Sequence, residues 1–306
     1  MPVSDEKKHT KKHKTIQHLV ISGGSFGGIV LYGALKQSNL RGEWSIDNIQ
    51  SIDAISAGSI LAVIISLKYD WEIIDNYIIK RPWQNILKFD KINPFKIIGD
   101  CGVFDVSVII EVIAPFLRGV GLSIDVSMRE FFEFTGIDLH FYATNLYTDE
   151  IVDFNHASFP DLRIVDAVYR SSTIPLFFIP QCEIKDEKEY FYLDGYLIAN
   201  YPSTQFLQRV GTDKHALGFK YANPHNKHKI TNIFDMAKQI IVNLFRKSHT
   251  TTIKLKHQYT FYLELFTVYE LYCIVNNSDK RRELLLLGEE CQSIFCSGGE
   301  AAAKNI

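Results

Sequence analysis

The sequence has no long apolar run, and its few cysteines follow no recognisable spacing. Apolar stretches such as ILAVIISL at 60–67 are far shorter than the roughly 20 residues that a membrane-spanning helix requires. The five cysteines are scattered, with no C-x-x-C pair, at positions 101, 182, 273, 291 and 296. We therefore expect an intracellular, cytoplasmic protein with free thiols, peripheral at membranes at most, and without a disulfide framework or a zinc site.

A strong net charge and the common metal motifs are also missing. The formal net charge is only -2, which argues against a protein whose whole surface binds nucleic acid. Neither an H-E-x-x-H pair nor an EF-hand loop occurs, so we expect no metal and no other cofactor. The 306 residues, 46% of them hydrophobic, are enough for the core of one large domain.

The two ends of the chain differ from its centre in composition. Residues 1–14 are rich in Lys and His and predict a disordered basic tail. The uncharged stretch that follows resembles a signal-peptide core, but the glycines of SGGSFGG at 22–28 interrupt it, which favours a buried strand and a turn. We expect a catalytic core at 15–205, a part at 206–297 that completes or flanks the same domain, and a tail at 298–306.

Hydrophobic patterning predicts an α/β fold. Two successive strand–turn–helix units, with strands TIQHLVI at 15–21 and IQSIDAI at 49–55, indicate parallel strands joined by crossover helices. A hairpin is expected at 137–156 and a helix, stopped by Pro175, from residue 163. Later strands are expected near 187–202 and 215–221, and C-terminal helices at 233–247, 259–275 and 279–295.

The glycine-rich turn at 22–28 allows several functions. No register of it supplies the glycines of the dinucleotide motif G-x-G-x-x-G, and the phosphate-loop motif fails because Ile29 and Val30 replace its Lys and Ser/Thr. Glycines there could instead aim backbone N–H groups at one point and form an oxyanion hole. The alternative is a tight turn that only packs a helix on the sheet.

Two serines compete for the role of nucleophile. Ser25 lies in GGSFG, a literal G-x-S-x-G, but it follows the first strand, and nothing upstream could furnish an oxyanion hole. Ser56 lies in A-x-S-x-G between a strand and a helix, where a nucleophile elbow is expected. An elbow needs small flanking residues, and Ala54 and Gly58 provide them. The pattern therefore favours Ser56.

A serine nucleophile needs a base, and none of the ten histidines lies in a convincing motif. His140 and His156 flank strands, and we expect them at the surface; the others that we considered lie in the tail or in polar and basic stretches, at positions 9, 13, 225, 228, 249 and 257. Asp194 in YLDGYLIANYP, after an aromatic strand, is the alternative base. An aspartate in an Asp-Gly pair is also typical of a hairpin turn.

Taken together, these segments resemble the patatin-like phospholipase family. The similar segments follow in the family's order from about residue 15 to 202: SGGSFGGIVLYGAL, AISAGS, FYATNLYTDEIVDF, DAVYRSSTIPLFFIP and YLDGYLIANYP. The resemblance implies a three-layer α/β/α fold with a mostly parallel central sheet and helical C-terminal additions. It also implies hydrolysis of phospholipid or related acyl esters through an acyl-serine, at transient contact with a membrane surface.

The resemblance assigns roles residue by residue. It implies a Ser–Asp dyad without histidine, in which Ser56 is the nucleophile and Asp194 the base. The implied oxyanion hole consists of the backbone amides of Gly23, Gly24 and Ser25. Residues implied to shape the loop and the elbow are Gly27, Gly28, Ala54, Gly58 and Gly195.

The chain departs from the family pattern at several positions. Ser25 replaces the third glycine and Gly27 the basic residue of G-G-G-x-[RK]-G, Ala54 replaces the elbow glycine, and Tyr196 follows the Asp-Gly pair. These departures bear on loop shape and access, hence on substrate choice and rate. Two alternatives therefore stay open: a catalytically impaired lipid-binding protein, and an esterase or acyltransferase that acts on soluble acyl esters.

Overall fold

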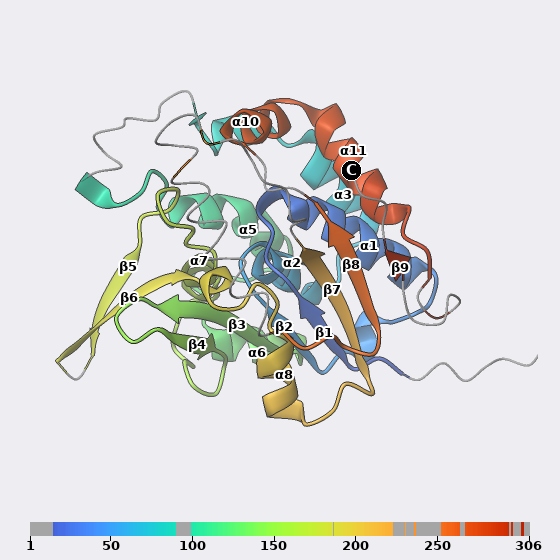
Figure 1. Ribbon diagram of the computed structural model, residues 1–306, viewed down its shortest axis with the longest axis horizontal. Helices are drawn as coiled ribbons and strands as arrows, with labels where there is room; N and C mark the ends of the chain where they lie inside the picture. Colours follow the sequence, from blue (N-terminus) through green and yellow to red (C-terminus); the bar gives the residue numbers. More distant parts are fainter. Residues whose placement is uncertain are drawn as a thin grey trace, which may run out of the picture.

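The computed structural model describes residues 15–89, 99–185, 187–222, 252–263 and 267–293, with residues 230, 236, 295, 301 and 302. In this part of the chain a nine-stranded sheet runs in the order β5-β6-β3-β2-β1-β7-β8-β9, and β4 also pairs with β3 (Figure 1). The strands are β1 His18–Ile21, β2 Ser51–Ala54, β3 Asp138–Asn145, β4 Glu150–Phe154, β5 Gln181–Lys185, β6 Lys188–Asp194, β7 Ala216–Ala222, β8 Gln258–Tyr262 and β9 Ala301–Ala302.

The centre of the sheet is parallel, as the repeated strand–turn–helix units predict. β1 pairs in parallel with β2 and β7, and β2 with β3. The predicted hairpin at 137–156 is confirmed as β3 and β4, which run antiparallel. β6 is antiparallel to both β3 and β5, and the β5–β6 pair projects from one end of the sheet (Figure 1).

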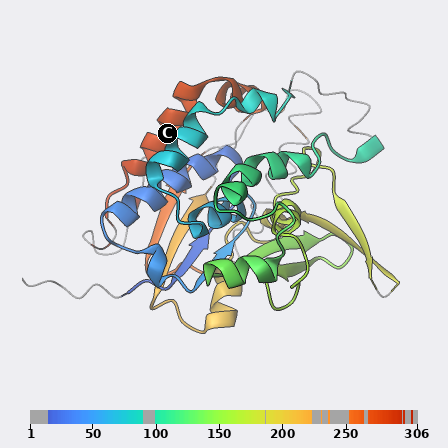
Figure 2. The same cartoon turned by 180° about the vertical axis from the view of Figure 1, so that it is seen from behind.

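Helices cover both faces of the sheet, so the predicted three-layer α/β/α arrangement is confirmed. Figure 1 shows α8 in front of the sheet, and Figure 2, from behind, shows the blue α1 and the green α5 in front of it. The helices are α1 Gly28–Leu40, α2 Ala57–Ser66, α3 Trp71–Lys80, α5 Ser107–Gly119, α6 Met128–Thr135, α7 Ile164–Ser171, α8 Ser203–Val210, α10 Val268–Asn276 and α11 Ser278–Glu289. Among them, none is both long and apolar enough to cross a bilayer.

The prediction of a helix over 259–275 is wrong in its first half. Residues Gln258–Tyr262 form β8, which pairs in parallel with β7, and α10 begins only at Val268. Tyr259 and Phe261 are buried, whereas Tyr262 is exposed, so this aromatic segment fits a pleated surface beside an available strand edge. Tertiary pairing here outweighs local helical periodicity. Except for residue 236, the helix expected at 233–247 lies outside the described residues, and so does the tail at 1–14.

The C-terminal helix α11 packs directly on the first helix. The two cross at a glycine pair, because a Cβ on Gly33 would overlap the carbonyl of Leu285 and a Cβ on Gly288 would overlap that of Val30. The guanidinium of the buried Arg281 on α11 also donates to backbone carbonyls in α3 and α10. These contacts join the last part of the chain to the layer that carries α1.

Adding a methyl group at Gly288, where the two helices cross, should destabilise the protein. Alanine favours helix over glycine by about 1 kcal/mol, but the added methyl group would force α1 and α11 apart, and overpacking of this kind costs about 1–3 kcal/mol or more. We expect Gly288→Ala to lower the melting temperature. Gly99→Ala is the control, since a Cβ there meets nothing within 4 Å, and equal melting temperatures would contradict the tight crossing.

Candidate active site

Ser56 lies at a sharp turn between β2 and α2. Its backbone is left-handed, with φ 54 and ψ -126, a conformation that costs a residue with a side chain about 1–3 kcal/mol. The turn is tight because a Cβ on Gly58 would lie 2.7 Å from the carbonyl oxygen of Ser22 at the end of β1. Ala54, the last residue of β2, is fully buried between its neighbours Ile21 and Phe141. Small residues before and after Ser56 therefore allow this strained turn.

The sheet brings Asp194 to Ser56 from a distant part of the chain. Asp194 is the last residue of β6 and pairs with Ala143 of β3, the strand next to β2. The Ser56 hydroxyl donates a hydrogen bond of 2.7 Å to Oδ2 of Asp194. Both side chains are buried, with 3% and 1% of their surface exposed.

Burial determines the electrostatics of Asp194. Loss of solvent raises the pKa of Asp194 to about 7, and this rise outweighs the lowering by hydrogen bonds from Ser56 and from the backbone of Tyr196. The Tyr196 amide donates to Oδ1 at 2.8 Å, so both carboxylate oxygens are oriented. A carboxylate of this pKa can accept and return a proton near neutral pH.

The glycine-rich loop lies beside Ser56, between β1 and α1. The Gly23 amide donates to the carbonyl of Asn200 at 3.2 Å. Within the described part of the chain, by contrast, no acceptor takes the N–H groups of Gly24 and Ser25. Of the three amides that the resemblance implies, two thus have no acceptor among the described residues. No sequence pattern predicts the contact with Asn200, because this residue acts through its backbone carbonyl, which any residue supplies.

Close packing explains the remaining small residues of the loop. A Cβ on Gly23 would lie 2.9 Å from the Tyr196 ring and 3.0 Å from Cβ of Ser56, so Gly23 fills a narrow gap beside Ser56. The ring of Tyr221 on β7 lies within 3.0 Å of the Cβ positions that side chains on Gly24 and Gly27 would need. Two further glycines are also confined: a Cβ on Gly28 would lie 3.0 Å from Cβ of Ala57, and a Cβ on Gly195 would overlap the carbonyl oxygen of Tyr142.

The histidines lie elsewhere, and the expected surface position of His140 is wrong. His140 is only 5% exposed because it points from the interior strand β3 toward Asp138 and Asp153. Although burial lowers the pKa of His140, hydrogen bonds to these two carboxylates raise it to about 9. His156 is partly exposed and also binds Asp138. Of the histidines that the structure describes, none has a hydrogen bond to the Ser56 or Asp194 side chain.

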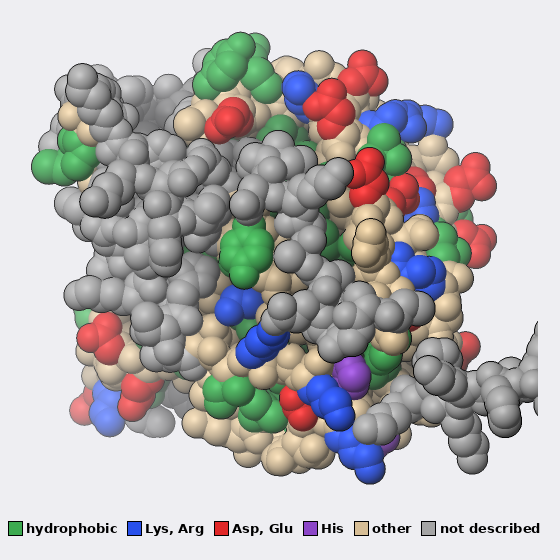
Figure 3. Space-filling view, turned by 45° about the vertical axis from the view of Figure 1, so that its right-hand side comes forward, with side chains coloured by type: hydrophobic (Ala, Val, Ile, Leu, Met, Phe, Trp, Pro, Cys, Tyr) green, Lys and Arg blue, Asp and Glu red, His purple; other side chains and the backbone are tan. Residues whose placement is uncertain are grey.

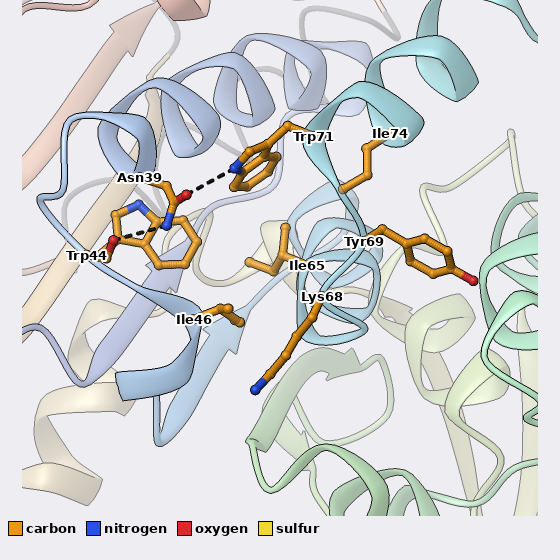
Figure 4. Close-up of a pocket in the computed structure, with 8 residues that line it drawn as sticks. All are labelled: Asn39, Trp44, Ile46, Ile65, Lys68, Tyr69, Trp71 and Ile74. Carbon is orange, nitrogen blue, oxygen red and sulfur yellow. Dashed lines mark hydrogen bonds between the residues drawn. The ribbon is translucent and has the colours of Figure 1, made fainter.

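A small pocket lies at the opposite end of α2. It measures about 90 Å³ and is lined by Asn39, Trp44, Ile46, Ile65, Lys68, Tyr69, Trp71 and Ile74 (Figure 4). With a rise of about 1.5 Å per residue along α2, it is on the order of 15 Å from Ser56 and separate from the Ser56–Asp194 pair. Among the described residues, no group of three or more His, Cys, Asp or Glu side chains could hold a metal ion. Figure 3 shows acidic and basic side chains interspersed over the described atoms of one face.

Comparison with known proteins finds similar chains in two viruses and one bacterium. The chain is 28% identical over 251 residues to "Probable lipid hydrolase 463L" of Invertebrate iridescent virus 6, covering 79% of each protein. It is 25% identical over 253 residues to "Uncharacterized protein R571" of Acanthamoeba polyphaga mimivirus, covering 79% of this chain and 80% of that protein. The crystal structure of VipD from Legionella pneumophila aligns with a TM-score of 0.46 and 15% identity, over 88% of this chain and 66% of that one.

A family model gives the assignment. The model of the patatin-like phospholipases matches residues 19–207, which is more than half of the chain. This range includes the glycine loop, the turn at Ser56 and the end of β6 at Asp194. The chain therefore belongs to the patatin-like phospholipase family.

Proposed function

We propose that this protein is a serine lipid acyl hydrolase of the phospholipase A or lysophospholipase type. Ser56 is the nucleophile and Asp194 the base in this proposal. The observation that carries it is the buried hydrogen bond of 2.7 Å between the Ser56 hydroxyl and a carboxylate whose pKa is about 7. A hydroxyl that donates to a base at this distance is ready for activation. The likeness to a protein named as a probable lipid hydrolase supports the substrate class.

In the proposed reaction Asp194 takes the hydroxyl proton as Ser56 Oγ attacks the ester carbonyl carbon. The N–H groups of Gly24 and Ser25 hold the negative oxygen of the tetrahedral intermediate, and each such donor contributes about 2.7–4 kcal/mol. Asp194 then returns the proton to the leaving alcohol or lysolipid, and an acyl-serine remains. A water molecule that Asp194 deprotonates then attacks the acyl-serine carbonyl carbon. Asp194 returns this proton to Ser56 Oγ as the ester bond breaks, which releases the fatty acid and restores the serine.

Product analysis tests this function against the two alternatives. Phosphatidylcholine vesicles and a soluble p-nitrophenyl acyl ester are incubated with the wild type and with Ser56→Ala, and the released acids are measured by mass spectrometry. A lipid hydrolase releases fatty acid from vesicles only with Ser56 present. Turnover of the soluble ester alone favours the esterase. Vesicle binding without turnover of either substrate favours the lipid-binding protein.

The proposal also predicts that the Ser25 hydroxyl is dispensable. Ser25 has a left-handed backbone, with φ 52, which costs a non-glycine residue about 1–2 kcal/mol. Ser25→Gly keeps the backbone N–H and removes this cost. We expect kcat/KM within about threefold of the wild type and a slightly higher melting temperature, since relief of a single backbone strain is worth about 1 kcal/mol. A loss of activity comparable to that of Ser56→Ala would instead give the Ser25 hydroxyl a chemical role.

A further inference from the structure

The hydroxyl of Ser171 is buried against the turn that carries Ser56. Ser171 is the last residue of α7 and is fully buried. Its Oγ accepts the backbone N–H of Ser56 at 3.0 Å and donates to the backbone carbonyl of Tyr142 at 2.7 Å. It also lies 3.0 Å from the Ser59 hydroxyl in the first turn of α2.

The hydrogen-bonding capacity of this hydroxyl is fully used. A serine hydroxyl has one proton and two lone pairs. The carbonyl of Tyr142 can only accept, so the single proton of Ser171 points to it. The two lone pairs then take the Ser56 N–H and the Ser59 O–H. Since these partners are held by two elements, the start of α2 and the strand β3, the hydroxyl can satisfy them in one orientation only.

These three partners connect the two halves of the dyad. Ser56 caps the N-terminus of α2 and Ser59 lies in the first turn of this helix, whereas Tyr142 belongs to β3. The residue after Tyr142, Ala143, pairs with Asp194. Two residues beyond Ser171, the carbonyl of Thr173 accepts the backbone N–H of Asp194 at 2.9 Å. The C-terminal end of α7 therefore contacts the backbone of both dyad residues.

We propose that Ser171 is a positioning residue, whose hydroxyl holds the strained backbone of Ser56 so that Oγ points at Asp194. This inference rests on the function proposed above for Ser56 and Asp194. The left-handed conformation of Ser56 persists only if its surroundings oppose relaxation, and the Ser171 bond to its N–H does so. Without that bond the turn can relax, and Oγ moves away from the carboxylate.

Ser172 provides a matched control for Ser171. It is the adjacent residue and is also buried, with 5% of its surface exposed, but its hydroxyl has no hydrogen-bond partner among the residues that the structure describes. Serine-to-alanine replacement removes the same atom at both positions. A general effect of emptying this region would appear in both variants, whereas loss of positioning would appear only in Ser171→Ala.

The test compares steady-state kinetics of Ser171→Ala and Ser172→Ala on a p-nitrophenyl acyl ester. For Ser171→Ala we expect kcat to fall on the order of 100-fold with KM nearly unchanged, because misplacement of a reacting group by about 1 Å has such an effect. The rate of Ser56 labelling by a fluorophosphonate should fall in parallel. The acid limb of the pH profile should move to higher pH, since the Ser56 hydrogen bond that lowers the pKa of Asp194 is weakened. Ser172→Ala should resemble the wild type throughout.

Two results would overturn the positioning role. One is a kcat of Ser171→Ala equal to that of Ser172→Ala, and the other is a loss that merely follows the fraction of folded protein measured by circular dichroism. If Ser171→Ala does not fold, Ser171→Cys replaces it, with Ser172→Cys as its control, because a thiol is a weaker acceptor at the same place. Failure of the proposed function has a different pattern: the wild type is neither labelled nor impaired by Ser56→Ala.

Discussion

Replacing Ser56 by alanine should reduce kcat for an acyl ester by at least about 10^4-fold, because removal of a serine nucleophile leaves only substrate binding and oxyanion stabilisation. The Ser56 hydroxyl is the group that donates to Asp194 at 2.7 Å, and the strained turn presents it at the start of α2. The measurement is fatty-acid release at substrate saturation. Circular dichroism would check that the variant is folded.

Ser25→Ala is the control for this replacement. Ser25 lies in the literal G-x-S-x-G of the chain, yet its place in the proposed site depends on its backbone N–H. We expect Ser25→Ala to retain activity within about tenfold of the wild type, since the N–H donor survives the replacement. Inactivation by Ser25→Ala with full activity of Ser56→Ala would reverse the assignment.

Asp194→Asn should abolish activity and at the same time stabilise the protein at alkaline pH. Asparagine cannot take the proton of Ser56, and loss of the general base of a serine hydrolase lowers kcat on the order of 10^6-fold. The stability effect follows from burial. Raising the pKa of Asp194 from 3.8 to about 7 costs the ionised native state on the order of 4 kcal/mol. Asparagine avoids this cost and still accepts the Tyr196 amide.

The size of the stability effect depends on pH in a defined window. Below about pH 4 Asp194 is protonated in both the native and the unfolded chain, so the wild type and Asp194→Asn should differ little in stability. Between about pH 4 and 7 the unfolded chain releases the proton first, and the wild type loses stability relative to Asp194→Asn. Melting temperatures at pH 4.5 and 8 would measure this. A difference that does not grow with pH would contradict the raised pKa.

The sequence predicts the parts of the site that depend on residue size. Ala54 and Gly58 are small because the end of β1 and neighbouring strands leave no space beside Ser56, and this requirement is visible as a motif. The parallel order of β1 and β2 follows in the same way from repeated strand–turn–helix units. Asp194 could be predicted from the sequence because a charged residue at the end of an aromatic strand stands out.

Other parts of the fold and site leave no comparable pattern. Ser171 acts through a common hydroxyl in a helix, and its partners are known only once β3 and α7 are placed together. The burial of His140 depends on two carboxylates from β3 and β4 that pairing brings to it. The sequence of β8 resembles a helix because the spacing of its aromatic residues continues the helical spacing of the apolar residues in α10. The segment forms a strand because it pairs with the edge of β7.

Labelling with a fluorophosphonate, followed by mass mapping of the peptides, tests which serine reacts. The reagent forms a stable adduct with a serine that is activated by a base and flanked by an oxyanion hole. We predict one adduct, on the peptide that contains Ser56, which disappears in Ser56→Ala and is greatly slowed in Asp194→Asn. An adduct on Ser25 or another serine, or an unlabelled folded protein that still releases fatty acid, would contradict a Ser56–Asp194 dyad.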